Sequence, residues 1–163
     1  MTTLWTIGYE KAAWPDVLAA LRTAGVAQVI DVRQLPLSRR AGFSKRQLAA
    51  GLAEVGIGYA HLRALGTPAE GREANKRRQW QRFWQVVDES LATLEAGLAL
   101  QQAASLARSA PSCLLCYEAD PCTCHRRRVG KLLAASDGFT VHDLSVLPLA
   151  GTSARQTPSR SCR

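Results

Sequence analysis

The sequence lacks any long apolar run. No stretch approaches the roughly 18 consecutive apolar residues that a membrane-spanning helix needs. The first ten residues, MTTLWTIGYE, have neither the basic start nor the apolar stretch of a secretory signal. These two absences predict a protein that does not cross a membrane, and we expect a cytoplasmic location.

Cysteine is present in an odd number, which argues against a set of paired disulfides. The chain has five cysteines, and its 163 residues are enough to build a core without covalent staples. A disulfide framework is therefore a poor explanation for these cysteines, and reduced thiols or metal ligands remain.

The composition is that of one folded domain with a basic excess. Hydrophobic residues make up 47% and charged residues 21% of the chain, which excludes wholesale disorder. The net charge of +8 makes a polyanion a plausible partner, and we expect a nucleotide or a nucleic acid. The last thirteen residues hold three arginines and no acid. We therefore divide the chain into a domain, residues 1–147, and a flexible basic tail, residues 148–163.

Short apolar runs of strand length alternate with stretches of helical periodicity. The predicted strands are 4–9, 26–32, 57–62, 113–117 and 139–144. Pro15 and Gly25 delimit the first helix, and Ser44 with Gln47 resembles a capping box for the second. The longest helical stripe begins at Trp80 and continues to about residue 108. Residues 63–79 are the least regular part and are expected to be a mobile excursion.

This alternation predicts a single three-layer α/β domain. It implies about five mostly parallel strands, joined by right-handed crossovers and covered by helices on both faces. We find no internal repeat, and the sequence does not determine the strand order or the oligomeric state.

The carboxyl ends of the predicted strands carry most of the polar candidates. In a parallel sheet these ends share one edge, where open α/β sheets bind ligands. The sequence therefore predicts a cleft at this edge. The residues placed there are Gly8, Tyr9, Asp31, Arg33, His61, Glu118, Asp120, His142 and Asp143.

Two predicted helix starts carry charge of the wrong sign for the helix dipole. Lys45 and Arg46 follow Ser44, and three arginines, from Arg126 to Arg128, follow Cys124. A bound anion would reverse this conflict, because a helix start supplies backbone donors and arginine supplies a fork of donors. The predicted anion-binding residues are Arg33, Ser38, Arg39, Lys45, His125 and Arg126. The specific expectation is that Arg33 and Arg126 hold one oxyanion between them.

Four motifs in order resemble the domain-of-unknown-function family numbered 488 (DUF488). They are TIGYE, IDVRQLPLSRRAGFSKRQL, GIGYAHLRALG and LLCYEADPCTCHRRRVGKLL, and together they span roughly residues 4 to 145. The resemblance implies a fold and little biochemistry. Cys122 departs from the family pattern, because a further cysteine is unusual in the turn before Cys124. The matching positions are Gly8, Tyr9, Asp31, Arg33, Pro36, Ser38, Arg39, Phe43, Ser44, Tyr59, Leu65, Gly66, Cys116, Glu118, Cys124, His125 and Arg126.

The first functional hypothesis is an enzyme, a hydrolase or transferase, that acts on a phosphate-bearing substrate. Cys124 is its candidate nucleophile, since a thiol at a helix start beside cations ionises readily. Glu118 or Asp31 is the candidate acid or base. Adjacent helical residues do not face each other, so His142 or His61 is as good a proton partner for the thiol as His125.

Two alternatives use the same residues differently. The first is a non-catalytic nucleic-acid-binding module, in which the cations contact phosphates and the cysteines are structural. The second is a zinc-binding protein that uses Cys116, Cys122, Cys124 and either His125 or His142. The spacing C-x5-C-x-C-H lacks the paired C-x2-C of ordinary structural zinc sites, so we expect no metal and no cofactor. Cys162 is expected to be exposed and free.

Overall fold

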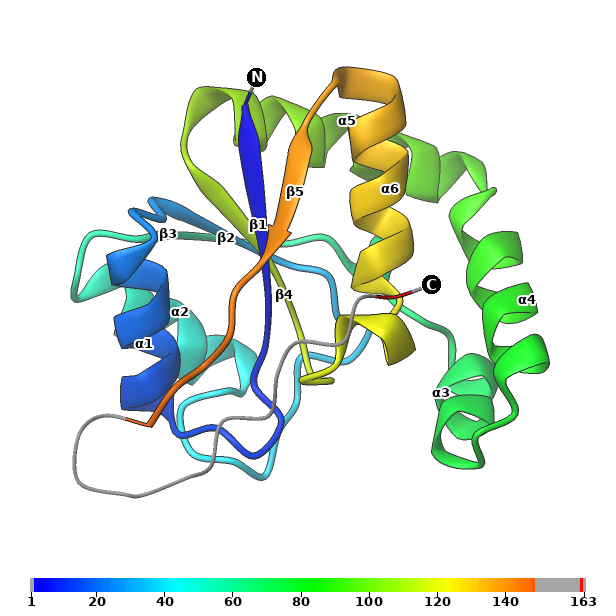
Figure 1. The fold of residues 1–163 in the computed structure, drawn as a ribbon, viewed down its shortest axis with the longest axis horizontal. Coiled ribbons are helices and arrows are strands. Elements are labelled where there is room, and N and C mark those ends of the chain that lie inside the picture. Colours follow the sequence, from blue (N-terminus) through cyan, green and yellow to red (C-terminus); the bar gives the residue numbers. More distant parts are fainter. Residues whose placement is uncertain (1, 149–161, 163) are drawn as a thin grey trace.

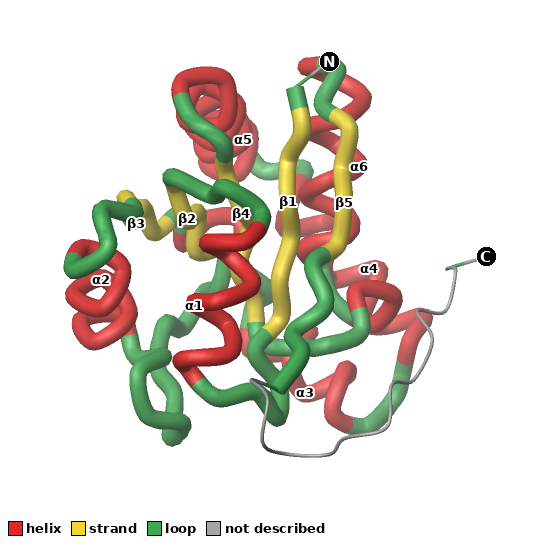
Figure 2. The backbone as a smooth tube through the Cα atoms, turned by 60° about the vertical axis from the view of Figure 1, so that its left-hand side comes forward, coloured by secondary structure: helices red, strands yellow, loops and turns green. Residues whose placement is uncertain are grey.

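The computed structural model describes residues 2–148 and residue 162. Its centre is one five-stranded sheet of order β3-β2-β4-β1-β5, in which every neighbouring pair is parallel. The strands are β1 (Thr3–Gly8), β2 (Gln28–Asp31), β3 (Gly58–His61), β4 (Ser112–Cys116) and β5 (Thr140–Asp143). Figure 2 shows β1 beside β4 and β5 in this sheet. The predicted α/β class and the five strands are confirmed.

Helices cover both faces of the sheet (Figure 1). The α-helices are α1 (Trp14–Thr23), α2 (Lys45–Ala53), α3 (Ala69–Lys76), α4 (Trp80–Leu91), α5 (Leu94–Ser109) and α6 (Arg126–Asp137). Two short 3-10 turns, η1 (Arg63–Leu65) and η2 (Pro121–Thr123), follow β3 and β4. No helix among the described residues is both long and apolar enough to cross a membrane.

Two apolar cores lie on opposite faces of the sheet. One core packs α1 and α2 against residues such as Val29 and Leu115. The other packs the remaining helices against residues such as Ile30 and Leu114. Successive residues of one strand thus enter different cores, because side chains alternate across a strand. All five residues of β4 are buried, as the near-continuous apolar runs of a parallel sheet predict.

Three expectations about individual helices are wrong. The helical stripe from Trp80 breaks at Thr93, where α4 ends and α5 begins. The segment 63–79 forms η1 and α3, so it is not an irregular excursion. The capping box at α2 does not form, because the Ser44 hydroxyl bonds the backbone of Ser38 and the Gln47 side chain accepts from Gly42 N–H.

The loops after β1, β2 and β4 meet at the carboxyl edge of the sheet. Helix α3 lies at this edge (Figure 2), and two side-chain hydrogen bonds fasten it there. Arg72 donates to the Gln34 side chain after β2, and Asn75 Nδ2 donates to the Thr123 carbonyl after β4 at 2.9 Å. The predicted tail, residues 148–163, lies outside the described residues except for Pro148 and Cys162.

Candidate functional site

The candidate site begins where β1 and β4 end side by side. Gly8 pairs with Cys116, and the chain after Cys116 turns back across Gly8. A Cβ atom on Gly8 would lie 1.8 Å from the carbonyl oxygen of Glu118. Only glycine leaves room for this crossing, so Gly8 sets the path of the loop that carries the reactive side chains.

That loop brings a histidine against two thiols. Cys124 has extended backbone (φ −120°, ψ 137°), and His125 is the N-cap residue of α6. His125 Nδ1 lies 3.6 Å from Cys116 Sγ and 3.9 Å from Cys124 Sγ. The three ligand atoms all lie within 4.8 Å of one another, and all three residues are buried. The prediction that His125 points away from Cys124 is wrong, because Cys124 precedes the helix and helical spacing does not apply to it.

The other nitrogen of His125 fixes the orientation of the ring. Nε2 lies 2.8 Å from the carbonyl oxygen of Val32, directly after β2. A carbonyl oxygen only accepts, so Nε2 carries a proton and Nδ1 presents its lone pair to the sulfurs when the ring is neutral. The helix start and the end of β2 are therefore neighbours, as predicted.

The two thiols and the carboxyl group beside them have shifted pKa values. Burial would raise the pKa of Cys124, but a hydrogen bond with Cys116 and the charge of Arg126 outweigh it and hold that pKa well below its ordinary value. The same hydrogen bond, with burial, raises the pKa of Cys116. Burial and the nearby charge of Cys124 raise the pKa of Glu118 to about 7. Without a ligand, the cluster therefore favours a Cys124 thiolate over a Cys116 thiolate.

The side chain of Arg126 lies beside this cluster, and its burial and its protein partners leave it unavailable to a ligand. It is 1% exposed, and it donates to Thr6 Oγ1 and to the carbonyls of Glu118 and Ala119. None of the ion pairs found among the described residues includes Arg126. Its charge is instead close to the thiols of the cluster. The guanidinium is thus part of the site's framework.

Arg33 and Asp31 form a second buried network. Arg33 donates two side-chain hydrogen bonds to Asp31, at 2.9 and 2.7 Å, and two more to Tyr9 Oη and the Phe43 carbonyl. Asp31 is fully buried and also accepts from Tyr59 Oη at 2.6 Å. The charged groups of both residues therefore already have hydrogen-bond partners within the protein. The expectation that Arg33 and Arg126 share an oxyanion is not supported by this geometry, and neither is a role for Asp31 as a free acid or base.

The remaining predicted residues lie apart from the thiols. His61 contacts the Arg33 carbonyl and Lys45 Nζ, and His142 is exposed with its ring 5.5 Å from that of Trp5. Ser38 is tied to Ser44, and Arg39 and Lys45 are exposed. The imidazole beside Cys124 is therefore that of His125, and not that of His61 or His142.

Cys122 does not belong to the cluster, because its sulfur is in a disulfide. It is bonded to Cys162, 40 residues along the chain. The expectation of an exposed free thiol at Cys162 is therefore wrong, and so is the idea that all cysteines are reduced thiols or metal ligands. The free cysteines are Cys113, Cys116 and Cys124, and all three are buried.

Sequence reasoning missed two partners of the site. Thr6 lies inside an apolar run and does not stand out there, although strand alternation places it on the same face as Leu4 and Gly8. The Val32 carbonyl that orients His125 is a backbone group, and no residue type signals it.

A comparison with protein families identifies the family of this chain. The family described as "Domain of unknown function DUF488" matches residues 13–133. The chain belongs to the DUF488 family. No curated protein and no solved structure gives a significant match.

The part of the chain that matches DUF488 includes the whole cluster of thiols and imidazole. It includes β2, β4 and the start of α6, whereas β1 and β5 lie outside it. The family description names no activity, so the function has to be argued from the site.

Proposed function

We propose that this DUF488 protein is an enzyme with a transition-metal centre of the zinc type, held by Cys116, Cys124 and His125, and that it acts on a phosphate-bearing substrate. The observation that carries the proposal is the convergence of three buried ligand atoms within 4.8 Å. The ligand set differs from the one considered from sequence, because Cys122 is in a disulfide and His142 is exposed. The proposal also replaces our expectation of no metal.

The distances between these atoms support a shared ion. In a tetrahedral zinc site with Zn–N of about 2.0 Å and Zn–S of about 2.3 Å, the nitrogen and sulfur atoms lie about 3.5 Å apart. The corresponding distances from His125 Nδ1 are 3.6 and 3.9 Å. An ion can therefore be placed between the three residues with little movement of their side chains.

The surroundings also suit a metal ligand set. Metal-bound histidines usually donate the second ring N–H to an oxygen, as His125 does to the Val32 carbonyl. Two thiolates neutralise a divalent ion, and a Glu118 carboxylate beside it would balance the buried charge of Arg126. Sulfur and imidazole ligands favour zinc, copper or iron over magnesium and calcium.

Burial weighs against Cys124 as a free nucleophile. A nucleophile must reach its substrate, and Cys124 has no exposed surface. In the proposed centre the sulfur itself need not meet the substrate, because the substrate would bind the metal at the position beside Glu118, which is only half-buried. The centre, and not the thiol alone, is therefore our candidate for the reactive group.

Three protein ligands leave one position for a water molecule or for the substrate. A metal of this type acts as a Lewis acid there and lowers the pKa of a bound water. Glu118 Oε2 lies 3.4 Å from Cys116 Sγ, close enough to take that position itself or to orient a group that occupies it. A hydrolase or transferase reaction fits this arrangement. The basic excess of the chain favours a phosphate-bearing substrate. A cytoplasmic location remains part of the proposal, although the disulfide between Cys122 and Cys162 is unusual in that compartment.

Metal content is the direct test. Protein produced in zinc-supplemented medium is expected to hold about one tightly bound ion per chain, and Cys124→Ser and Cys116→Ser are each expected to lower its affinity at least tenfold. Cobalt substitution should produce thiolate-to-cobalt charge-transfer absorption that both variants weaken. Cys113→Ser is the matched control, since Cys113 is equally buried but outside the cluster. Protein that binds neither zinc nor cobalt, with Cys124 open to rapid alkylation, would overturn the metal centre and restore the thiol nucleophile.

A further inference from the structure

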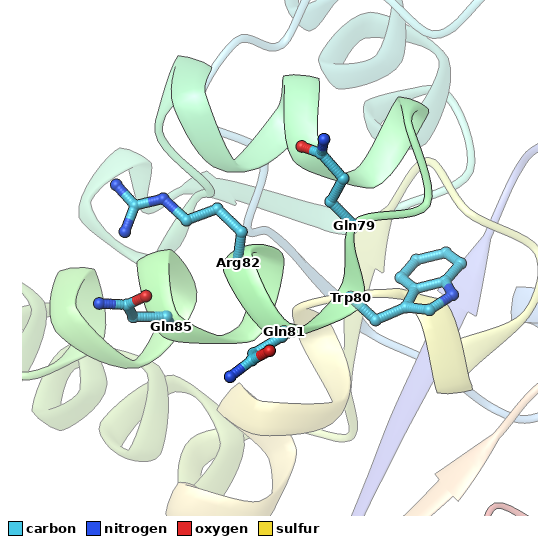
Figure 3. A pocket seen from close by; sticks show the side chains of 5 residues that line it. All are labelled: Gln79, Trp80, Gln81, Arg82 and Gln85. Atoms are coloured by element: carbon cyan, nitrogen blue, oxygen red, sulfur yellow. The ribbon is translucent and has the colours of Figure 1, made fainter.

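The turn between α3 and α4 carries a second group of residues that the metal centre does not use. A groove of about 350 Å³ is lined by Gln79, Trp80, Gln81, Arg82 and Gln85. Figure 3 shows the side chains of Gln79 and Trp80 at one end of the groove and those of Arg82 and Gln85 at the other. Its volume lies within the range of roughly 300–1,000 Å³ found for small-ligand sites.

We propose that the α3–α4 hairpin, residues 69–91, binds single-stranded nucleic acid and presents it to the neighbouring metal centre. The binding itself stands on the observations below, and only its use in a reaction rests on the proposed function.

The side chains of the groove match the chemistry of an unpaired strand. Trp80 is 39% exposed, although a tryptophan is usually mostly buried. An exposed indole offers a face on which a base can stack, and such stacking contributes about 1–3 kcal/mol per base. The glutamine amides both donate and accept, so they can bond base edges that a duplex would hide.

The turn of the hairpin is strongly basic. Residues 76–82 hold four basic residues and no acid, whereas residues 69–91 as a whole carry a net charge of +1. Arg77 and Arg78 are both exposed at the turn. Arg77 pairs with Glu73 and Arg82 pairs with Glu70, both on the surface, where water screens such interactions strongly. The turn therefore offers cations to a phosphate backbone.

The turn has an ordered shape that holds these cations in place. Arg78 has φ 56°, a conformation that residues other than glycine rarely adopt. Its N–H donates to the Asn75 carbonyl, and Gln79 N–H donates to the Ala74 carbonyl.

A second pocket extends the basic surface along α4. It is about 120 Å³ in volume and is lined by Trp84, Arg127, Arg128 and Lys131. The Arg128 guanidinium lies 5.0 Å from the centre of the Trp84 ring. Trp80 and Trp84 are four residues apart on one helix and so share a face. A surface with aromatic and cationic groups at both pockets fits an extended strand better than a single phosphate.

The hairpin lies next to the loop that carries the metal ligands. Asn75 Nδ2 donates to the carbonyl of Thr123, the residue before Cys124. The end of α3 is therefore fastened to the loop that carries Cys124, which is what the proposed delivery of a strand to the metal centre requires.

The test measures binding of a short labelled oligothymidylate, an oligouridylate and a duplex of equal length to the full-length protein at several salt concentrations. We expect both single strands to bind more tightly than the duplex. Trp80→Ala should weaken single-strand binding about 5- to 100-fold, the equivalent of one base stack. Replacing both Arg77 and Arg78 by glutamine should reduce the slope of log affinity against log salt by about 0.7 for each phosphate that is no longer neutralised. Arg22→Gln, on the opposite face in α1, is the charge control and should have no effect.

The same measurement on metal-free Cys124→Ser protein separates this proposal from the metal centre. Binding that persists without metal supports the hairpin even if the metal centre proves wrong. The proposal is overturned if neither single strand binds at low salt, if the duplex binds as well as the single strands, or if the Trp80 and arginine variants bind like the parent.

Discussion

At the scale of single residues, Gly8 has the most direct consequence for the site. A Cβ atom there would overlap the Glu118 carbonyl, the oxygen that accepts from Arg126. Gly8→Ala is expected to lower the free energy of unfolding by about 1–3 kcal/mol, as overpacking in a core does. It should also lower the metal content, because the Cys116–Cys124 loop must shift. Urea denaturation and elemental analysis measure the two effects.

Gly97→Ala is the control for this change. Gly97 lies inside α5, and a Cβ atom there would meet nothing within 4 Å. Alanine should therefore stabilise the protein by about 0.5–1 kcal/mol through helix propensity. A Gly8→Ala protein as stable as the parent would contradict the close crossing at the end of β1.

Several predicted residues are important for a reason that the sequence did not indicate. Asp31 and Arg33 were expected to face a ligand, but they neutralise each other in the interior and hold Tyr9 and Tyr59. Their position at the end of β2 was predictable from the apolar run before them. Their orientation was not, because it depends on Phe43, which arrives from a different part of the chain.

At the scale of elements, Thr93 lies between two helices that the apolar periodicity of the sequence predicted as one. Its hydroxyl accepts from Ala96 N–H at 3.2 Å and so caps α5. Thr93→Ala should lower the free energy of unfolding by about 1 kcal/mol through loss of the cap. Thr93→Ser keeps the hydroxyl and should stay within a few tenths of the parent. Equal stability of the alanine and serine variants in thermal denaturation would show that the cap does not stabilise α5.

Helix α3 was not predicted because its inward face is small. The buried residues of α3 are Gly71 and Ala74, which produce no apolar stripe. Thr67 and Val86 would lie against any side chain at position 71, so close packing requires the glycine. A helix with a small inward face lies close to its neighbours, and for the same reason it lacks the usual signal in the sequence.

At the scale of the whole molecule, the disulfide between Cys122 and Cys162 ties the end of the chain to η2. A peptide map without reductant should recover these two cysteines in one linked peptide. Closing a loop of about 40 residues stabilises a protein by about 4 kcal/mol in the chain-entropy account. Cys162→Ser should therefore lower the melting temperature of oxidised protein and have little effect once the parent is reduced. A freely alkylated Cys162 in oxidised protein would contradict the disulfide.

The fold class, and the edge of the sheet at which the site lies, follow from local patterns in the sequence. Apolar runs of strand length alternate with helical periodicity, and this local pattern is enough to imply parallel strands with a shared carboxyl edge. It also placed Cys124, His125 and Arg126 near that edge.

Which of these groups contact one another depends on how the chain packs. The His125 ring is oriented by the carbonyl of Val32, which is 93 residues away in the sequence. The Arg126 guanidinium donates to the hydroxyl of Thr6, which is 120 residues away. Spacing along a chain describes neighbours within one helix or strand, whereas these hydrogen bonds form between segments that only the strand order β3-β2-β4-β1-β5 brings together. The cluster of two thiols and one imidazole, and the disulfide that removes Cys122 from it, therefore follow from packing and not from local spacing.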